Sequence, residues 1–347
     1  MSLLSQLNLE YPIFLAPMAG VSTPQLAAQV SNAGALGSLG LGASDLESCR
    51  KQILETQALT DKPFQVNFFC HRSETADPQI AQQWIEYLQP HFAQFDQPVP
   101  QTLNCIYPSF LDSDDYLNLV LELRPAAVSF HFGIPHPHQI QALKDAGIVT
   151  MVTATNLSEA QAIEQAGIDL IVAQGVEAGG HRGIFNADND AAMTTIHLVQ
   201  LLHKYCSIPI VAAGGIMTGQ QARYALDSGA SAVQLGTAFI QCASSNASTM
   251  YREALFDEPI TQISAAISGR PARGIINDWH KQVDSIYRPE IPAYPYTYDL
   301  AKQLHTAAAK HNHHGYAAFW AGANVSQIRQ LEAYELVRTL VKEMHYA

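Results

Sequence analysis

Short apolar runs alternate with helical segments along the first two thirds of the chain, and this alternation constrains the fold most. The runs are nearly continuous in apolar residues, which is typical of parallel strands covered on both faces. Eight such strands, separated by helices, predict a closed (β/α)8 barrel. A doubly wound open sheet is the alternative, weakened by the lack of an early GxGxxG motif. The predicted strands are residues 11–17, 35–40, 63–69, 126–133, 148–154, 168–173, 208–213 and 231–239.

The pattern changes after residue 240, and a barrel does not need the segment that follows. Three stretches are predicted to be helical, and a proline-rich stretch of little periodicity, 258–296, lies among them. The predicted helices are 244–256, 297–310 and 324–345. We expect an α/β protein with a mostly helical cap or side domain beside the barrel mouth. Its predicted parts are the barrel at 1–243, the cap at 244–325 and a C-terminal helix at 326–347 that packs back on the barrel.

Composition excludes several classes of protein. The formal net charge of −12 makes nucleic acid and anionic membranes poor partners. No apolar stretch is long enough to span a membrane, and the N-terminus lacks the basic region of a signal peptide. Five cysteines without a CxxC pair suit a reducing compartment. We therefore expect a cytoplasmic protein.

Three consecutive strands end in loops of the kind that hold ligands. The first loop, 174–183, contains Gly179 and Gly180, followed by His181 and Arg182 as donors, with one fixed positive charge. Glycine lets backbone N–H groups approach a ligand closely, and such loops cradle anions, most often phosphate. In barrels the last two loops are the usual phosphate site. These two loops contain Gly214 and Gly215, and Gly236 and Thr237.

Polar residues at other strand ends suit a flat heterocycle. Asn67, Gln174 and Gln234 offer both donors and acceptors. The carboxyl ends of all barrel strands lie at one face, so these amides and the glycine loops should lie close together there. A phosphate joined to a polar ring indicates a nucleotide or flavin mononucleotide (FMN).

Several motifs resemble those of the nitronate monooxygenases, flavin enzymes formerly called 2-nitropropane dioxygenases. The similarity spans about residues 10–325. Its motifs are APMAG at 16–20, SFHFG at 129–133, VAQGVEAGGHRG at 172–183, IVAAGGI at 210–216 and QLGTAF at 234–239. YPYTYDLAK at 294–302 and FWAG at 319–322 are similar to elements of class I members.

The resemblance implies a barrel that binds FMN and oxidises alkyl nitronates, such as propionate 3-nitronate, with molecular oxygen. It implies no metal and no nicotinamide. The matching motifs imply that the FMN contacts are Ala16, Pro17, Met18, Asn67, Gln174, Gly179, Gly180, Gly214, Gly215, Gln234, Leu235, Gly236 and Thr237.

Two histidines are the predicted catalytic residues. His131, at the fourth strand end, is expected to titrate near neutral pH and to serve as a donor or a base. His181 could position the substrate or bond the flavin. Tyr294, Tyr298 and Lys302 lie four apart and would share one face of a helix, where they could close over an anionic substrate. The predicted substrate-binding residues are these three with Tyr107, His131 and His181.

Two other functions remain open from the sequence. An FMN-dependent NAD(P)H reductase of enoyl thioesters or quinones would share the glycine loops. A flavin-free barrel could bind a phosphorylated metabolite. No metal site is expected, since the histidine run at 311–314 lacks carboxylates or cysteines at ligand spacing. The chain could be a monomer or a homodimer.

Overall fold

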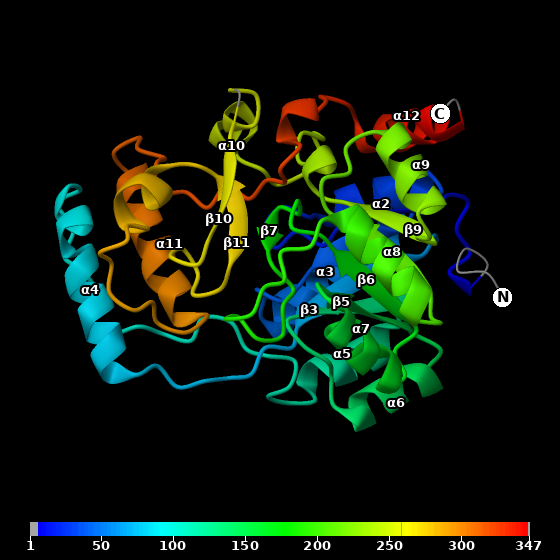
Figure 1. Cartoon of the computed structure of the whole chain (residues 1–347), viewed down its shortest axis with the longest axis horizontal. Coiled ribbons are helices and arrows are strands. Elements are labelled where there is room, and N and C mark those ends of the chain that lie inside the picture. Colours follow the sequence, from blue (N-terminus) through cyan, green and yellow to red (C-terminus); the bar gives the residue numbers. More distant parts are fainter. Residues whose placement is uncertain (1–5, 258, 346–347) are drawn as a thin grey trace.

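The computed structural model describes residues 6–257 and 259–345, and its larger lobe is a barrel (Figure 1). Eight parallel strands follow the order β1-β9-β8-β6-β5-β4-β3-β2. Leu36 closes the ring: its N–H donates to the Ile13 carbonyl (2.9 Å), and its carbonyl accepts from the Leu15 N–H (2.8 Å). The predicted (β/α)8 barrel is confirmed. The strands are β1 (Ile13–Leu15), β2 (Gly37–Gly40), β3 (Phe64–Phe69), β4 (Ala127–His131), β5 (Val149–Ala154), β6 (Leu170–Gln174), β8 (Ile210–Ala213) and β9 (Ala232–Leu235).

Helices cover the outside of the barrel, and their ends follow local sequence signals. The Thr23 side chain accepts from the Leu26 N–H and caps the first of them. Gly147 and Gly167 end two others at positive φ, a conformation that favours glycine. The C-terminal helix α12 (Ala333–His345) packs on α9 and α2. The covering helices are α2 (Pro24–Asn32), α3 (Leu46–Leu59), α5 (Asp115–Leu123), α6 (Pro137–Asp145), α7 (Leu157–Gln165), α8 (Thr195–Tyr205) and α9 (Gly219–Asp227).

A second, smaller lobe has its own apolar core. Helix α4 (Pro78–Ala93) lies beside α11 (Tyr296–Ala309), away from the barrel (Figure 1). Trp84 from α4 packs in one cluster with Trp279 and Leu300, all fully buried. Trp279 belongs to a π-helical turn, η2 (Trp279–Val283). The second lobe therefore takes α4 and the segment after it, with Phe95 and Val99, from within 1–243, and its other parts from the C-terminal part of the chain.

The proline-rich stretch 258–296 contains two strands that the sequence pattern did not reveal. β10 (Thr261–Ser264) pairs antiparallel with β11 (Ala272–Ile275). β11 in turn pairs with β7 (Gly180–His181), a two-residue strand in the glycine loop after β6. Each is too short for alternation to be read. This small sheet ties the second lobe to the barrel mouth.

Two predicted helices are wrong in extent. The helix predicted at 244–256 is only α10 (Thr249–Ala254). The helix predicted at 324–345 is a 3-10 turn, η3 (Val325–Gln327), and then α12, which begins at Ala333. Another 3-10 turn, η1 (Thr237–Phe239), follows β9.

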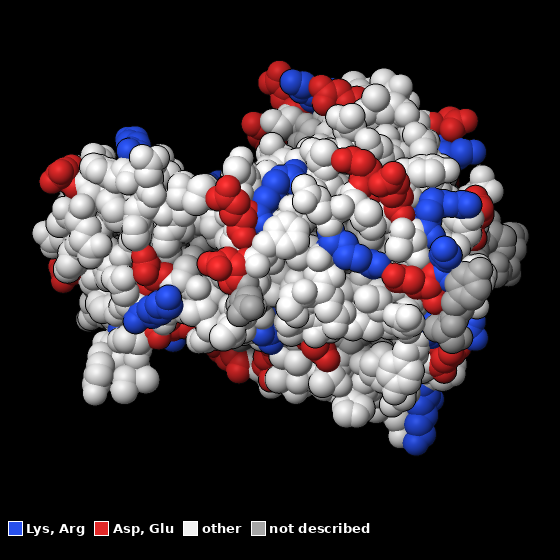
Figure 2. All heavy atoms as spheres, turned by 90° about the horizontal axis from the view of Figure 1, so that it is seen from above, with Lys and Arg blue, Asp and Glu red and all other residues white. Residues whose placement is uncertain are grey.

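Charged side chains are sparse on the face seen from above, and the two signs are intermixed (Figure 2). This agrees with a charged fraction of only 14%. Within residues 6–257 and 259–345, no helix is both long and apolar enough to cross a bilayer.

Candidate active site

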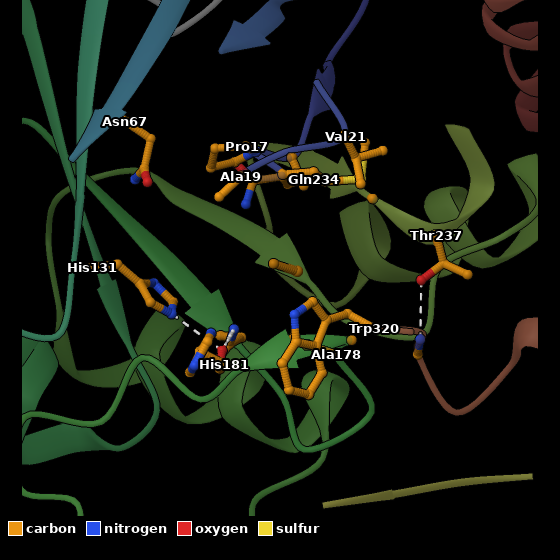
Figure 3. A pocket seen from close by; sticks show the side chains of 18 of the residues that line it. Pro17, Ala19, Val21, Asn67, His131, Ala178, His181, Gln234, Thr237 and Trp320 are labelled. Carbon is orange, nitrogen blue, oxygen red and sulfur yellow. Dashed lines mark hydrogen bonds between the residues drawn. The ribbon is translucent and has the colours of Figure 1, made fainter. Parts of the chain in front are cut away.

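A cavity of about 490 Å³ opens at the carboxyl ends of the barrel strands. The barrel supplies most of its wall, and the second lobe closes one side with Tyr294, Tyr298 and Lys302. Figure 3 shows side chains from strands far apart in the sequence that converge on it. All the predicted FMN, catalytic and substrate contacts line this cavity: Ala16, Pro17, Met18, Asn67, Tyr107, His131, Gln174, Gly179, Gly180, His181, Gly214, Gly215, Gln234, Leu235, Gly236, Thr237, Tyr294, Tyr298 and Lys302.

The glycine loops form a backbone cradle at the barrel end of the cavity. Gly214 and Gly215, directly after β8, have φ of 119° and 70°. A Cβ at Gly215 would lie 2.9 Å from the Cβ of Glu177. Glycine is therefore required there both for its φ and for the close approach. The Thr237 hydroxyl accepts from the Gly322 N–H at 3.0 Å, which holds the segment after the second lobe against the cradle (Figure 3).

The three predicted amide side chains that line the cavity differ in how many hydrogen bonds they already make. The buried Oε1 of Gln234 has no partner among the described residues. Asn67 Nδ2 donates to the Ser129 carbonyl and hydroxyl, each at 3.1 Å. Both polar atoms of the Gln174 amide bond the glycine loop: Nε2 donates to the His181 carbonyl (2.9 Å), and Oε1 accepts from the Gly183 N–H (2.8 Å). Its amide therefore supports the glycine loop.

Both ring nitrogens of His131 bond protein groups. Nε2 lies 3.1 Å from the His181 carbonyl oxygen, and Nδ1 lies 3.0 Å from the Thr153 hydroxyl (Figure 3). A carbonyl only accepts, so Nε2 carries the proton and Nδ1 accepts from Thr153. Burial lowers the pKa of His131 to about 4, and the nearby positive charge of Arg270 adds to the shift. The expectation that His131 titrates near neutral pH is therefore wrong: the ring is neutral at pH 7.

His181 also has an environment that keeps it neutral. His181 lies in β7, and its partly buried side chain lines the cavity. Its Nε2 lies 2.9 Å from the hydroxyl of Ser268, a fully buried residue. Burial, with the charges of His131 and Arg270, lowers the pKa of His181 to about 3. Its Nδ1 makes no hydrogen bond to the described residues, so this nitrogen is left for the cavity.

The second lobe contributes a tyrosine-lysine wall. Helix α11 begins at Tyr296, so Tyr298 and Lys302 share one helical face, whereas Tyr294 precedes the helix and still lines the cavity. Lys302 Nζ donates to the Tyr107 hydroxyl at 2.9 Å. Burial raises the pKa of Tyr107 and of Tyr298 to about 12, so both stay neutral donors. Lys302, exposed at the mouth, is the one Lys or Arg among the described lining residues, and no Asp or Glu joins it.

Arg182 does not serve the cavity, contrary to the expectation of a ligand donor. It is fully buried, its Nε donates to Asp190 (2.7 Å) and its NH1 donates to the Gly175 carbonyl (2.7 Å). The guanidinium braces the glycine loop from behind, and its charge is paired. Within residues 6–257 and 259–345, no cluster of three or more His, Cys, Asp or Glu side chains is arranged to hold a metal.

Several lining residues were not predicted. Trp320 projects into the cavity (Figure 3), and Asn324 Nδ2 donates to the Gly215 carbonyl at 2.6 Å. The FWAG motif was the available signal for Trp320, but nothing in the local pattern indicated that Asn324 reaches the cradle. Thr153 and Ser129 were also missed because each lies inside a buried strand and orients a predicted residue.

Comparisons with known proteins identify the family of the chain. Residues 1–343 match the family described as Nitronate monooxygenase. The nitronate monooxygenase of Pseudomonas aeruginosa is 50% identical over 341 residues, covering 97% of each chain. That of Paraburkholderia phytofirmans is 49% identical, covering 99% of this chain and 94% of the relative. A crystal structure of nitroalkane oxidase from Streptomyces ansochromogenes is 37% identical with a TM-score of 0.89, covering 99% of this chain and 98% of that one. The resemblance read from the motifs is thereby confirmed: the chain belongs to the nitronate monooxygenase family.

Proposed function

We propose that this protein is an FMN-dependent nitronate monooxygenase that oxidises small alkyl nitronates of the propionate 3-nitronate type with molecular oxygen. The observation that carries the proposal is the charge of the cavity wall. Lys302 is its one Lys or Arg, no carboxylate lines it among the described residues, and the histidines are neutral. Such a wall attracts an anion locally, although the whole chain is strongly negative.

The residues of the barrel end fit FMN. The loops at Gly179, Gly214 and Gly236 leave backbone groups open to the cavity, which suits a phosphate. The unpartnered Oε1 of Gln234 suits an N–H of a polar ring, because a buried acceptor without a partner is costly. Bound there, the flavin would supply the redox chemistry between the nitronate and oxygen.

The remaining cavity residues would bind and orient the substrate. Lys302 and the Tyr107 hydroxyl stand together at the mouth, where they would hold a second anionic group such as a carboxylate. Tyr298 and Trp320 would exclude water from the reacting end. His181, whose Nδ1 has no partner among the described residues, would accept a proton there. His131 would position His181, since it donates to the His181 carbonyl.

One assay tests the proposed function. Purified protein should be yellow, should release FMN on denaturation and should consume oxygen with propionate 3-nitronate without NADH. Colourless protein that takes up no FMN would leave the flavin-free barrel as the better reading. Rapid anaerobic bleaching of the flavin by NADH or NADPH, without nitronate oxidation, would instead identify the reductase.

We also propose a cytoplasmic location. All five cysteines are free, which suits a reducing compartment.

A further inference from the structure

The turn between β10 and β11 bonds His181 in a way that fixes where its proton lies. Ser268, at this turn, is fully buried. Its hydroxyl lies 3.0 Å from the Arg270 carbonyl oxygen, 3.3 Å from the Arg270 N–H and 2.9 Å from His181 Nε2. A carbonyl can only accept, so the single hydroxyl proton goes to the Arg270 carbonyl. The hydroxyl oxygen is then an acceptor for the other two partners.

This arrangement assigns the His181 tautomer. An oxygen that only accepts needs an N–H opposite it, so His181 Nε2 must be protonated. In the neutral ring the lone pair then lies on Nδ1, the nitrogen without a partner among the described residues. A proton can be gained or lost at Nδ1 without breaking the bond to Ser268.

The backbone around this contact is held by the small sheet. His181 pairs with Ala272 in the β7–β11 ladder, and the Arg182 N–H donates to the Pro271 carbonyl at 2.8 Å. Gly269 has φ of 90°, and a Cβ there would lie 2.6 Å from the Tyr294 nitrogen. The turn is therefore packed against the segment that carries Tyr294. Ser268 has little freedom to move away from His181.

We propose that Ser268 is a positioning residue for the reaction: it fixes His181 as the Nε2–H tautomer and so directs the ring's proton-accepting nitrogen, Nδ1, at the bound substrate. This inference rests on the proposed function for its catalytic part, but the tautomer itself does not. Without the hydroxyl, Nε2 has no acceptor from this turn, and the proton can move to Nδ1 and block the cavity side.

Other groups around His181 do not supply the same restraint. The rings of Tyr294, Tyr298 and Trp320 have centroids 5.7, 6.0 and 5.4 Å from the imidazole, and none makes a hydrogen bond to it in the described structure. The charged or titratable groups near His181 are His131, Arg270, Tyr294, Tyr298 and Lys302. Lys302 lies one turn of α11 after Tyr298. All these groups remain when Ser268 is changed, so a change in tautomer reports on the hydroxyl.

The test is nitrogen NMR of the histidine rings in the FMN-loaded enzyme at pH 7.5, with the His181 signals assigned by their loss in His181→Gln. The wild type should show a protonated Nε2 and an unprotonated Nδ1. In Ser268→Ala the two nitrogen shifts should move toward each other as the tautomers mix. Turnover with propionate 3-nitronate should fall on the order of tenfold, the effect of one orienting hydrogen bond. The Michaelis constant and the flavin content should change little.

Ser264→Ala is the matched control, because Ser264 is also buried and, among the residues that the structure describes, its hydroxyl bonds the Ala266 N–H alone, at 3.0 Å. It should keep both the tautomer and the turnover. A wild-type His181 protonated at Nδ1, or a Ser268→Ala enzyme with an unchanged tautomer, would overturn the proposal. A wild type that shows the expected tautomer but oxidises no nitronate would refute the proposed function and leave the tautomer assignment standing.

Discussion

Replacing Lys302 with methionine should weaken the binding of nitronates that carry a carboxylate. The size of the effect depends on how exposed the Lys302 ammonium is to solvent. The ammonium is exposed at the cavity mouth and already bonds the Tyr107 hydroxyl. A buried charged hydrogen bond contributes about 1.5–3 kcal/mol, whereas an exposed ion pair contributes about 0.2–1 kcal/mol. For this partly solvated site we take about 1 kcal/mol, which corresponds to roughly a fivefold rise in the Michaelis constant.

The assay is oxygen consumption with propionate 3-nitronate and with ethylnitronate, which has no carboxylate. The Michaelis constant should rise with propionate 3-nitronate only. Turnover should not change, because the lost contact holds the bound substrate and the transition state equally well. The rise in the Michaelis constant should shrink in 1 M salt, where the Debye length is about 3 Å. Lys204→Met, on the exposed side of α8, removes the same charge and should have no effect. Equal changes for both substrates, or a change insensitive to salt, would refute this account of Lys302.

Three further outcomes follow from the glycine cradle and the buried histidines. Gly215→Ala should lower the FMN content, measured by absorbance, because it strains a backbone with φ of 70° beside the cavity. Gly147→Ala is the control: Gly147 has φ of 72°, open space around it and no place in the cavity wall. This variant should lose stability but keep its FMN. Arg270→Met should raise the pKa of His131 and of His181, followed by NMR titration, since the buried positive charge lowers both; unchanged values would show that Arg270 does not contribute to either shift. In the folded protein the pKa of both histidines lies below the unfolded value of about 6.5, so the unfolded chain binds more protons in acid. The histidines should therefore lower the free energy of unfolding, and with it the Tm, as the pH falls from about 6.5 toward 4. A Tm that stays constant from pH 7.5 to 5 would contradict this.

The barrel and its cavity could be predicted from sequence because each depends on local signals. Continuous apolar strands and glycine-rich strand ends carry their own signature, and barrel closure brings the ends together. The second lobe could not be predicted equally well. α4 packs there through long-range apolar contacts of Trp84, and no local pattern distinguishes such a helix from one that covers the barrel.

The protonation states and bonding partners of individual side chains could not be predicted from the sequence either. The expectation for His131 failed because its pKa depends on burial and on Arg270, which lies far away along the chain. Arg182 looked like a ligand donor until Asp190 was seen to neutralise it. In both cases the residue type was informative, and the three-dimensional partner decided its role.

The two walls of the cavity have separate origins in the chain, and this bears on how such an enzyme can diversify. The cradle is made of barrel loops, whereas Tyr294, Tyr298, Lys302 and Trp320 come from the C-terminal part beyond the last barrel strand. Substitutions in the latter set can therefore change which nitronate is accepted while the cofactor cradle is inherited intact. The β7–β11 ladder limits this independence, because it joins His181 to Ala272 across the boundary. A chimaera that exchanges the second lobe between relatives should retain activity only if the segment from β10 to β11 is transferred together with a compatible β7.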